Sequence, residues 1–233
     1  MTNQVKEPVW IGVDVGTTGV RAMAYTSAGK AVASSEAFYP LETPQYDWAE
    51  QNPQQIYDAV EEVVRSTVAE LQYKLVNISG IALSTVMHSF IPLDGDYQLL
   101  GNMITWADSR SAAIVRRMEQ EERCRDFYFR TGCPLHACYP LAKLVWMKEN
   151  RPNLFARMAH IGSIKDYMFR LMTGEWVTDK SVASSSGLYN ELEEAWDCDI
   201  LAYIGIEETQ LPKVVSTTYS AKLIKDTAQR LGL

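Results

Sequence analysis

Residues 9–26, VWIGVDVGTTGVRAMAYT, combine two apolar segments with a short polar break, and this arrangement limits the fold more than any other part of the chain. The first segment, 9–15, carries a single acid, Asp14, and ends at the Gly-Thr-Thr-Gly sequence of residues 16–19. The second segment, 20–26, alternates with period two, so we predict two strands joined by a tight turn. A carboxylate beside so apolar a strand is costly without a partner, which indicates a role for Asp14.

The order of the remaining patterns predicts an α/β fold. SAGK at 27–30 is a turn that leads into a third strand over 31–39, so the chain opens with an antiparallel meander. Asn52 followed by Pro53 is a typical helix start, and apolar residues at three- and four-residue steps predict a helix over 54–72. Further strands are expected over 78–86, 88–94 and 99–106, and further helices near 109–122, 140–150, 163–173, 196–204 and 220–231. This order suggests an α/β sandwich of three layers.

Composition and charge exclude several classes of function. The chain has 233 residues, 47% of them hydrophobic, which is enough for one large domain or two small ones. Its formal net charge of −7 argues against nonspecific binding to nucleic acid or to anionic membranes. The chain has no apolar run of about 18 residues, and its start, MTNQVKEP, lacks the apolar region of a secretory signal. We therefore expect neither a nucleic-acid partner nor a membrane partner.

The four cysteines do not suggest a metal site. CPLHAC, residues 133–138, places His136 between two cysteines, which is a reason to consider zinc. No fourth ligand follows at a suitable spacing, so we do not expect zinc to bind there. Reduced thiols in a cytoplasmic protein are the simpler interpretation.

The Gly-Thr-Thr-Gly turn is suited to binding phosphate. It lacks the Lys and the following helix of a P-loop, and it lacks a dinucleotide-binding fingerprint. Its backbone N–H groups and the hydroxyls of Thr17 and Thr18 can surround phosphate oxygens, and Asp14 can hold Mg²⁺ directly or through water. Arg21 would add a cation near a transferring phosphoryl group. The alternative is a glycine-rich hairpin turn with a solvated acid.

Two later segments carry residues suited to a polyol. His88 follows a strand that should neighbour the opening hairpin, although a lone histidine is more often structural. In ITWADSRS, Trp106 can cover the carbon face of a sugar while Asp108 and Arg110 bind its hydroxyls. A helix cap is the alternative for Asp108.

The chain resembles the FGGY carbohydrate kinases. The resemblance rests on DVGTTGVRA, YDWAEQNP, Met87-His88, ITWADSRS, YPLAKLVWMKENRP, KDYMFRLMTG and VTDKSVASSSGLYN, which occur in the order seen in that family and cover nearly the whole chain. The sequence is most similar to the gluconate kinase branch, and xylulose kinases are close behind. The resemblance implies a ribonuclease H-like, actin-like ATPase domain, with a mixed sheet and helices on both of its faces.

The resemblance also implies roles for individual residues, with ATP and Mg²⁺ as nucleotide and cofactor. Asp14 would be the metal residue, with Gly16, Thr17, Thr18 and Arg21 around the nucleotide phosphates. The sugar acid would contact Met87, His88, Trp106, Asp108, Arg110 and His136.

The chain departs from the family in its length. Family members have two such domains, and their catalytic base is an Asp that would lie beyond Leu233. We therefore expect residues 1–233 to be the N-terminal, sugar-binding domain, truncated before its last strands and inactive alone. In the full-length protein the reaction would convert gluconate to 6-phosphogluconate.

Several alternatives stay open. The parent could act on xylulose or on another ketose or polyol, the chain could be a non-catalytic sugar-binding lobe, or it could be a phosphatase or chaperone lobe. Exposed apolar surface would favour a homo-oligomer.

Overall fold

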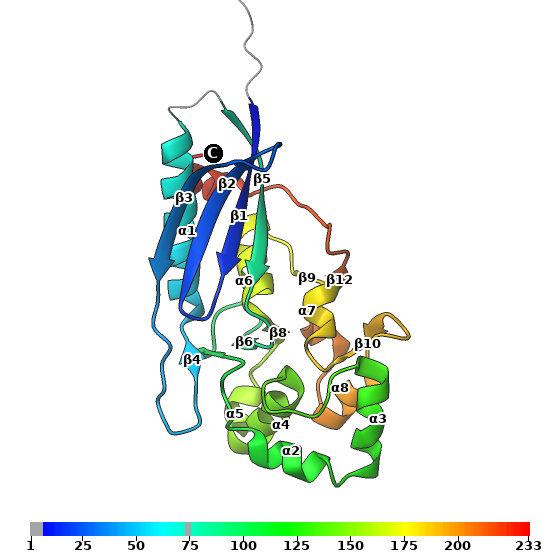
Figure 1. Cartoon of the computed structure of the whole chain (residues 1–233). Helices are drawn as coiled ribbons and strands as arrows, with labels where there is room; N and C mark the ends of the chain where they lie inside the picture. Colours follow the sequence, from blue (N-terminus) through cyan, green and yellow to red (C-terminus); the bar gives the residue numbers. More distant parts are fainter. Residues whose placement is uncertain (1–6, 73–75) are drawn as a thin grey trace, which may run out of the picture.

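A four-stranded mixed sheet forms the first half of the molecule (Figure 1). The computed structural model describes residues 7–72 and 76–233. The sheet contains β1 (Glu7–Val15), β2 (Gly19–Thr26), β3 (Ala31–Phe38) and β5 (Val76–Thr85), in the order β3-β2-β1-β5. The first three strands are antiparallel neighbours, which confirms the predicted meander, whereas β5 runs parallel to β1.

Three helices cover one face of this sheet. In α1 (Pro53–Leu71), Ile56, Val60, Val63 and Val64 pack against the buried side chains of β1 and β2, as the spacing predicted. The carboxamide oxygen of Asn52 accepts hydrogen bonds from two backbone N–H groups of the first turn, so the predicted cap is present. The helices α6 (Ile164–Thr173) and α9 (Lys225–Leu231) contribute to the same core.

The opposite face of the sheet is open. Trp10, Asp14, Arg21 and Tyr25 alternate with buried residues along β1 and β2, and all four are exposed. No helix among the described residues covers this face. We expected helices on both faces of the sheet and three layers. The described residues place helices on one face only, so the sheet and its helices form two layers. The physical reason is the period-two pattern, which places apolar branched side chains on one side of the strands alone.

A second, mainly helical half lies beside the end of the sheet where β1 and β5 finish (Figure 1). Its own core gathers around Phe90, Leu144, Tyr189 and Ile200. Its helices are α2 (Ala112–Met118), α3 (Glu122–Thr131), α4 (Pro140–Asn150), α5 (Pro152–Phe155), α7 (Lys180–Ser184), α8 (Cys198–Ile204) and the 3₁₀ turn Glu208–Gln210. Its short strands, with those that join it to the sheet, are β4 (Glu50–Gln51), β6 (Ile91–Leu93), β7 (Met103–Ile104), β8 (His160–Gly162), β9 (Val177–Asp179), β10 (Tyr189–Asn190), β11 (Ala195–Trp196) and β12 (Lys213–Val215).

Several predicted bounds differ from the structure. The strands expected over 88–94 and 99–106 are reduced to β6 and β7, because the polar turn at Asp94 and the exposed Gly101 interrupt the pairing. The helix expected near 109–122 begins at Ala112 and ends at Met118, and α3 was missed. Within residues 7–72 and 76–233, no helix is both long enough and apolar enough to cross a membrane.

Candidate functional site

Hydrogen bonds within the loop and from Tyr39 hold the hairpin loop between β1 and β2. Within the loop, the N–H of Gly16 donates to the carbonyl of Gly19 at 2.9 Å. The hydroxyl of Tyr39 lies 2.7 Å from the carbonyl oxygen of Gly16 and 3.0 Å from that of Gly19. Tyr39 is buried, and both its burial and the nearby Asp14 carboxylate raise the pKa of its hydroxyl, so it stays protonated as a donor. The loop is therefore fixed before any ligand arrives.

Asp14 and Arg21 face each other on the open side of the sheet. Their backbones are paired in register, and both side chains are exposed. The guanidinium of Arg21 donates to Glu36 at 2.8 Å, whereas the carboxylate of Asp14 has no hydrogen bond or ion pair with the part of the chain that the structure describes. The hydroxyl of Thr18 is exposed as well. These groups are available to a ligand above the loop.

Trp106 connects this loop to the predicted sugar segment. Its indole N–H donates to the hydroxyl oxygen of Thr17 at 3.0 Å, and the side-chain amide of Gln51 donates to the carbonyl of Thr17 at 2.8 Å. Trp106 remains 46% exposed, so its side chain is accessible to a ligand. The structure thus joins a predicted phosphate residue and a predicted sugar residue directly.

Met87 and His88 emerge beside the hairpin, as predicted. The N–H of Val86 donates to the carbonyl of Val15 at 2.8 Å, so the two strand ends lie side by side. His88 has a left-handed backbone with φ of 61°, which turns the chain sharply after β5. Its Nδ1 lies 2.8 Å from the carbonyl oxygen of Ser185. Because a carbonyl only accepts, Nδ1 carries the proton and Nε2 of the neutral ring is an acceptor.

Asp108 and Arg110 form a buried ion pair instead of facing outward. Asp108 is 1% exposed, and its carboxylate accepts from the guanidinium of Arg110 at 2.7 Å and from the N–H of Ala49 at 2.7 Å. Arg110 also donates to Glu50 at 2.6 Å, and its guanidinium lies 3.6 Å from the ring centre of Trp48. The pair therefore fixes the loop that precedes α1, and direct contact of Asp108 or Arg110 with a sugar stays a prediction.

His136 lies apart from the hairpin, on the segment that precedes α4. Its side chain is exposed, and its Nδ1 accepts a hydrogen bond from the N–H of Cys138 at 3.1 Å. The proton of the neutral ring is therefore on Nε2, which makes that atom a donor. Tyr139 links this segment to His88, because the two rings meet edge-on with centres 4.8 Å apart.

Lys143 is a residue of this region that the sequence interpretation missed. It lies on α4 with 0% of its surface exposed, and its ammonium donates to the carbonyls of His88 at 2.9 Å and Thr105 at 2.7 Å, and to that of Cys138. Burial lowers its pKa from 10.5 to about 7, although the Asp108 carboxylate opposes that shift. A lysine inside PLAKLVWM, a helix that is apolar on nearly every side, was the available signal.

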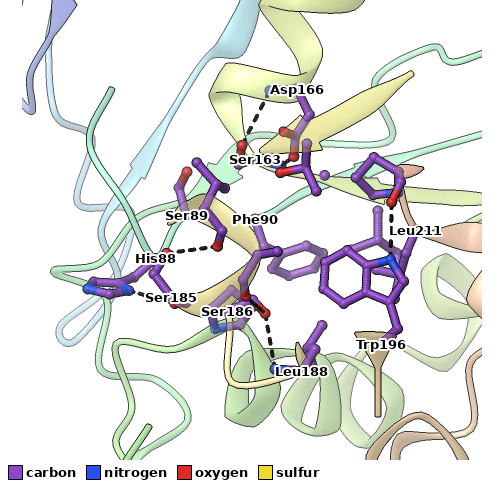
Figure 2. A pocket seen from close by; sticks show the side chains of 17 residues that line it. His88, Ser89, Phe90, Ser163, Asp166, Ser185, Ser186, Leu188, Trp196 and Leu211 are labelled. Carbon is purple, nitrogen blue, oxygen red and sulfur yellow. Dashed lines mark hydrogen bonds between the residues drawn. The ribbon is translucent and has the colours of Figure 1, made fainter. Parts of the chain in front are cut away.

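A small cavity behind His88 is not the sugar site. Its volume is about 40 Å³, room for a few water molecules but not for a six-carbon sugar. Figure 2 shows Asp166 and Ser163 at one end of it, with Trp196 and Leu211 along another side. A polyol would therefore have to bind outside this cavity, and the predicted contacts Met87 and Trp106 are both exposed.

One carboxylate is available for a cation in this region. The described residues contain no group of three or more His, Cys, Asp or Glu side chains placed to hold a metal ion. Asp14 alone still suits Mg²⁺, which is commonly held by one or two carboxylates together with water and substrate phosphates. The donor set fits a metal that arrives with a nucleotide, and it does not fit a metal caged by protein ligands.

The N-terminal domain of the FGGY family of carbohydrate kinases matches residues 9–233. A gluconokinase of Bacillus subtilis (strain 168) is 35% identical over 208 residues, which cover 89% of this chain and 40% of the relative. A xylulose kinase of the same strain is 32% identical over 228 residues, which cover 96% of this chain and 45% of the relative. The chain thus spans less than half the length of these relatives.

Solved structures of carbohydrate kinases have the same fold as this chain. A gluconate kinase from Lactobacillus acidophilus superimposes with a TM-score of 0.93 and 34% identity, over 98% of this chain and 46% of that one. A ligand-bound xylulose kinase from the same species superimposes with a TM-score of 0.93 and 34% identity, over 97% of this chain and 46% of that one. The actin-like fold class is confirmed, and the two substrates are not distinguished.

Proposed function

The chain belongs to the FGGY family of carbohydrate kinases, and from this premise we propose that it is the sugar-binding lobe of a kinase that transfers a phosphoryl group from ATP to gluconate. The product would be 6-phosphogluconate. Xylulose is the second candidate, because a ligand-bound xylulose kinase is as similar to this chain as a gluconate kinase is.

The contact between Trp106 and Thr17 is the observation that carries the proposal. The indole N–H lies 3.0 Å from the threonine hydroxyl oxygen, so a sugar stacked on the exposed indole would lie next to the hairpin loop. Phosphoryl transfer depends mainly on positioning, with the acceptor hydroxyl in line with the phosphoryl group. The hairpin loop and the Met87-His88 segment follow the carboxyl ends of parallel neighbours, β1 and β5, which is the usual place for a ligand in such sheets.

The hairpin loop would bind the phosphates of the nucleotide. Asp14 would hold Mg²⁺, which neutralises developing charge on the phosphates when bound. The backbone of Gly16, with Thr17 and Thr18, would contact phosphate oxygens. Arg21 is held by Glu36 in an exposed pair, and such pairs are weak enough for a phosphate to replace the carboxylate.

The tautomers of His88 and His136 determine which group of the sugar acid each ring could contact. Nε2 of His88 is an acceptor, so it suits a sugar hydroxyl. Nε2 of His136 is a donor, so among the proposed sugar residues it is the one suited to the carboxylate of gluconate. Arg110 is already paired with Asp108 and Glu50, which makes it a poor candidate for that carboxylate.

The catalytic base would come from outside the described residues. Asp108, itself one of the proposed sugar residues, is 1% exposed, and both of its carboxylate oxygens already accept hydrogen bonds from the guanidinium of Arg110, which makes it a poor candidate for the base. We propose that residues 1–233 bind sugar but do not catalyse phosphoryl transfer on their own.

The proposal includes a cytoplasmic location, where ATP is present and the four free cysteines would stay reduced. Self-association through exposed apolar surface stays a prediction.

Calorimetric titration of the 233-residue chain with gluconate, xylulose and glycerol tests the sugar. We expect gluconate to bind most tightly, and we expect His136→Ala to weaken gluconate more than xylulose. Tighter binding of xylulose would overturn the gluconate assignment, and no binding of any of the three would overturn the sugar-binding lobe. A coupled assay with gluconate and Mg-ATP should show no turnover above background; clear turnover would mean that the chain contains its own base.

A separate titration with Mg-ATP tests the hairpin. Asp14→Asn should weaken Mg-ATP binding and leave gluconate affinity nearly unchanged. The matched control is Asp126→Asn, which removes an exposed carboxylate on α3, away from the hairpin. Equal Mg-ATP binding by the two variants would show that Asp14 is only a turn residue.

A further inference from the structure

Lys143 joins three separate segments of the chain through backbone carbonyls. Its ammonium donates to His88 at 2.9 Å, to Thr105 at 2.7 Å and to Cys138. These acceptors follow β5, follow β7 and precede α4, respectively. An ammonium has three N–H donors, and all three are used.

The three segments are those that carry the proposed sugar contacts. Met87 and His88 belong to the first, Trp106 directly follows Thr105, and His136 lies two residues before Cys138. None of these segments is a long helix or strand that could fix its own position. Phe90 pairs with Ile104 and the ring of Tyr139 meets that of His88, so two of the segments touch the first one directly. Lys143 is the single buried side chain that donates to the backbones of all three.

The burial of this charge has a cost that argues for a function. Nothing of Lys143 is exposed, and burial lowers its pKa to about 7. The charged and titratable groups around it are Asp108 and Arg110 on one segment, Cys138 on another, and His88 on the third. Asp108 favours the charged ammonium and Arg110 opposes it. A neutral amine has only two N–H donors, so loss of the proton would release one carbonyl.

We propose that Lys143 is a positioning residue that holds the His88, Trp106 and His136 segments in the one arrangement that binds the sugar. Lys143 touches no sugar itself; it acts through the backbone carbonyls of its three partners. The inference rests on the proposed function, because only that function makes these three segments a sugar site. The positioning of the segments by Lys143 can be tested without any sugar.

Lys143→Met is the main variant, and Lys148→Met is its matched control. Lys148 lies on the same helix and also donates to a backbone carbonyl, that of Ile204 at 2.7 Å, but it is exposed and its acceptor is on α8, outside the three segments. Hydrogen exchange should show that residues 86–90, 104–108 and 134–139 lose protection together, by about tenfold or more, in Lys143→Met only. Unchanged protection there, or an equal loss in β1 and α1, would overturn the proposal.

A measurement on the unaltered chain covers the case in which the variant does not fold. The ¹⁵N–¹H resonances of the Trp106 indole and of the His88 segment should shift between pH 6 and 9 with a common midpoint near 7. Lys143→Arg, whose guanidinium stays charged, should remove that common transition. Independent midpoints for the two segments in the unaltered chain would overturn the proposal.

The sugar measurement separates this inference from the proposed function. Gluconate affinity should fall about tenfold or more in Lys143→Met and stay within about twofold in Lys148→Met. If the unaltered chain binds gluconate and Lys143→Met binds it equally well, the positioning role is wrong and the proposed function stands. If the unaltered chain binds no sugar while the three segments still respond together, the proposed function is wrong and the structural coupling stands.

Discussion

The hydroxyl of Tyr39 lies 2.7 Å from the carbonyl oxygen of Gly16, and this contact ties the end of β3 to the loop between β1 and β2. Tyr39 follows Gly16 by 23 residues, yet its backbone N–H also donates to the carbonyl of Thr18 at 3.2 Å. A loop of glycines and threonines would otherwise be free to change shape. Tyr39 therefore fixes the backbone of the loop that we propose to bind phosphate.

Tyr39→Phe should therefore destabilise the chain slightly and weaken Mg-ATP more than gluconate. The lost hydrogen bond is expected to lower the free energy of unfolding by about 0.5–1.5 kcal/mol, since the ring is kept and only the hydroxyl is removed. Urea denaturation and calorimetric titration measure the two effects. A loss of stability with unchanged nucleotide binding would show that the loop needs no support from Tyr39.

Thr17 and Trp106 should show a coupling energy in a double-mutant cycle. Thr17→Val removes the acceptor and Trp106→Phe removes the indole donor, so the double variant should lose less gluconate affinity than the two single losses combined. We expect a coupling of about 0.5–1.5 kcal/mol. Thr217→Val, on an exposed segment near β12, is the control for the loss of a threonine hydroxyl. Strict additivity would mean that the two segments bind their ligands independently.

The parts of the fold that could be predicted from the sequence depend on local patterns. The meander follows from period-two alternation around the Gly-Thr-Thr-Gly turn, and α1 follows from Asn52, Pro53 and the apolar spacing behind them. The placement of His88 beside the hairpin was also predictable, because a parallel β5 brings both strand ends to one edge.

The missed features depend on contacts between distant residues. Lys143 bonds to carbonyls that lie 38 and 55 residues earlier, and no local pattern encodes such partners. The guanidinium of Arg110 contacts Glu50, 60 residues earlier, and the ring of Trp48, which the sequence did not indicate. Its predicted contact with a sugar stays a prediction, and the direction of the side chain depends on tertiary packing.

Arg110→Ala should act mainly on stability. It would leave the carboxylate of Asp108 buried without its cation, which typically costs about 3–5 kcal/mol of unfolding free energy. The ratio of gluconate to xylulose affinity should not change in the folded fraction. Arg117→Ala is the control, because Arg117 pairs with Glu149 at the surface, where such pairs contribute less than about 1 kcal/mol. A selective loss of gluconate affinity with little loss of stability would instead support Arg110 as a sugar contact.

Asp166 should make the chain less stable at neutral pH than at acidic pH. Burial raises its pKa from 3.8 to about 6, although hydrogen bonds with Ser163 partly oppose that shift. One carboxylate oxygen accepts from the N–H of Ser163 at 2.7 Å, and the other has no hydrogen-bond partner among residues 7–72 and 76–233. The folded chain therefore binds this proton more tightly than the unfolded chain. The contribution of this group to stability is fully present below about pH 4 and is lost as the pH rises through 6.

Asp166→Asn removes the ionisation and keeps an oxygen that can accept from Ser163. We expect the variant to be more stable than the unaltered chain at pH 7 by about 1–3 kcal/mol, with the difference vanishing near pH 4. Urea denaturation at several values between pH 4 and 8 measures this, and Asp126→Asn, on an exposed part of α3, should show no such trend. A variant that is less stable at every pH would mean that the helix cap requires the ionised carboxylate, so that its hydrogen bonds outweigh the cost of burying the charge.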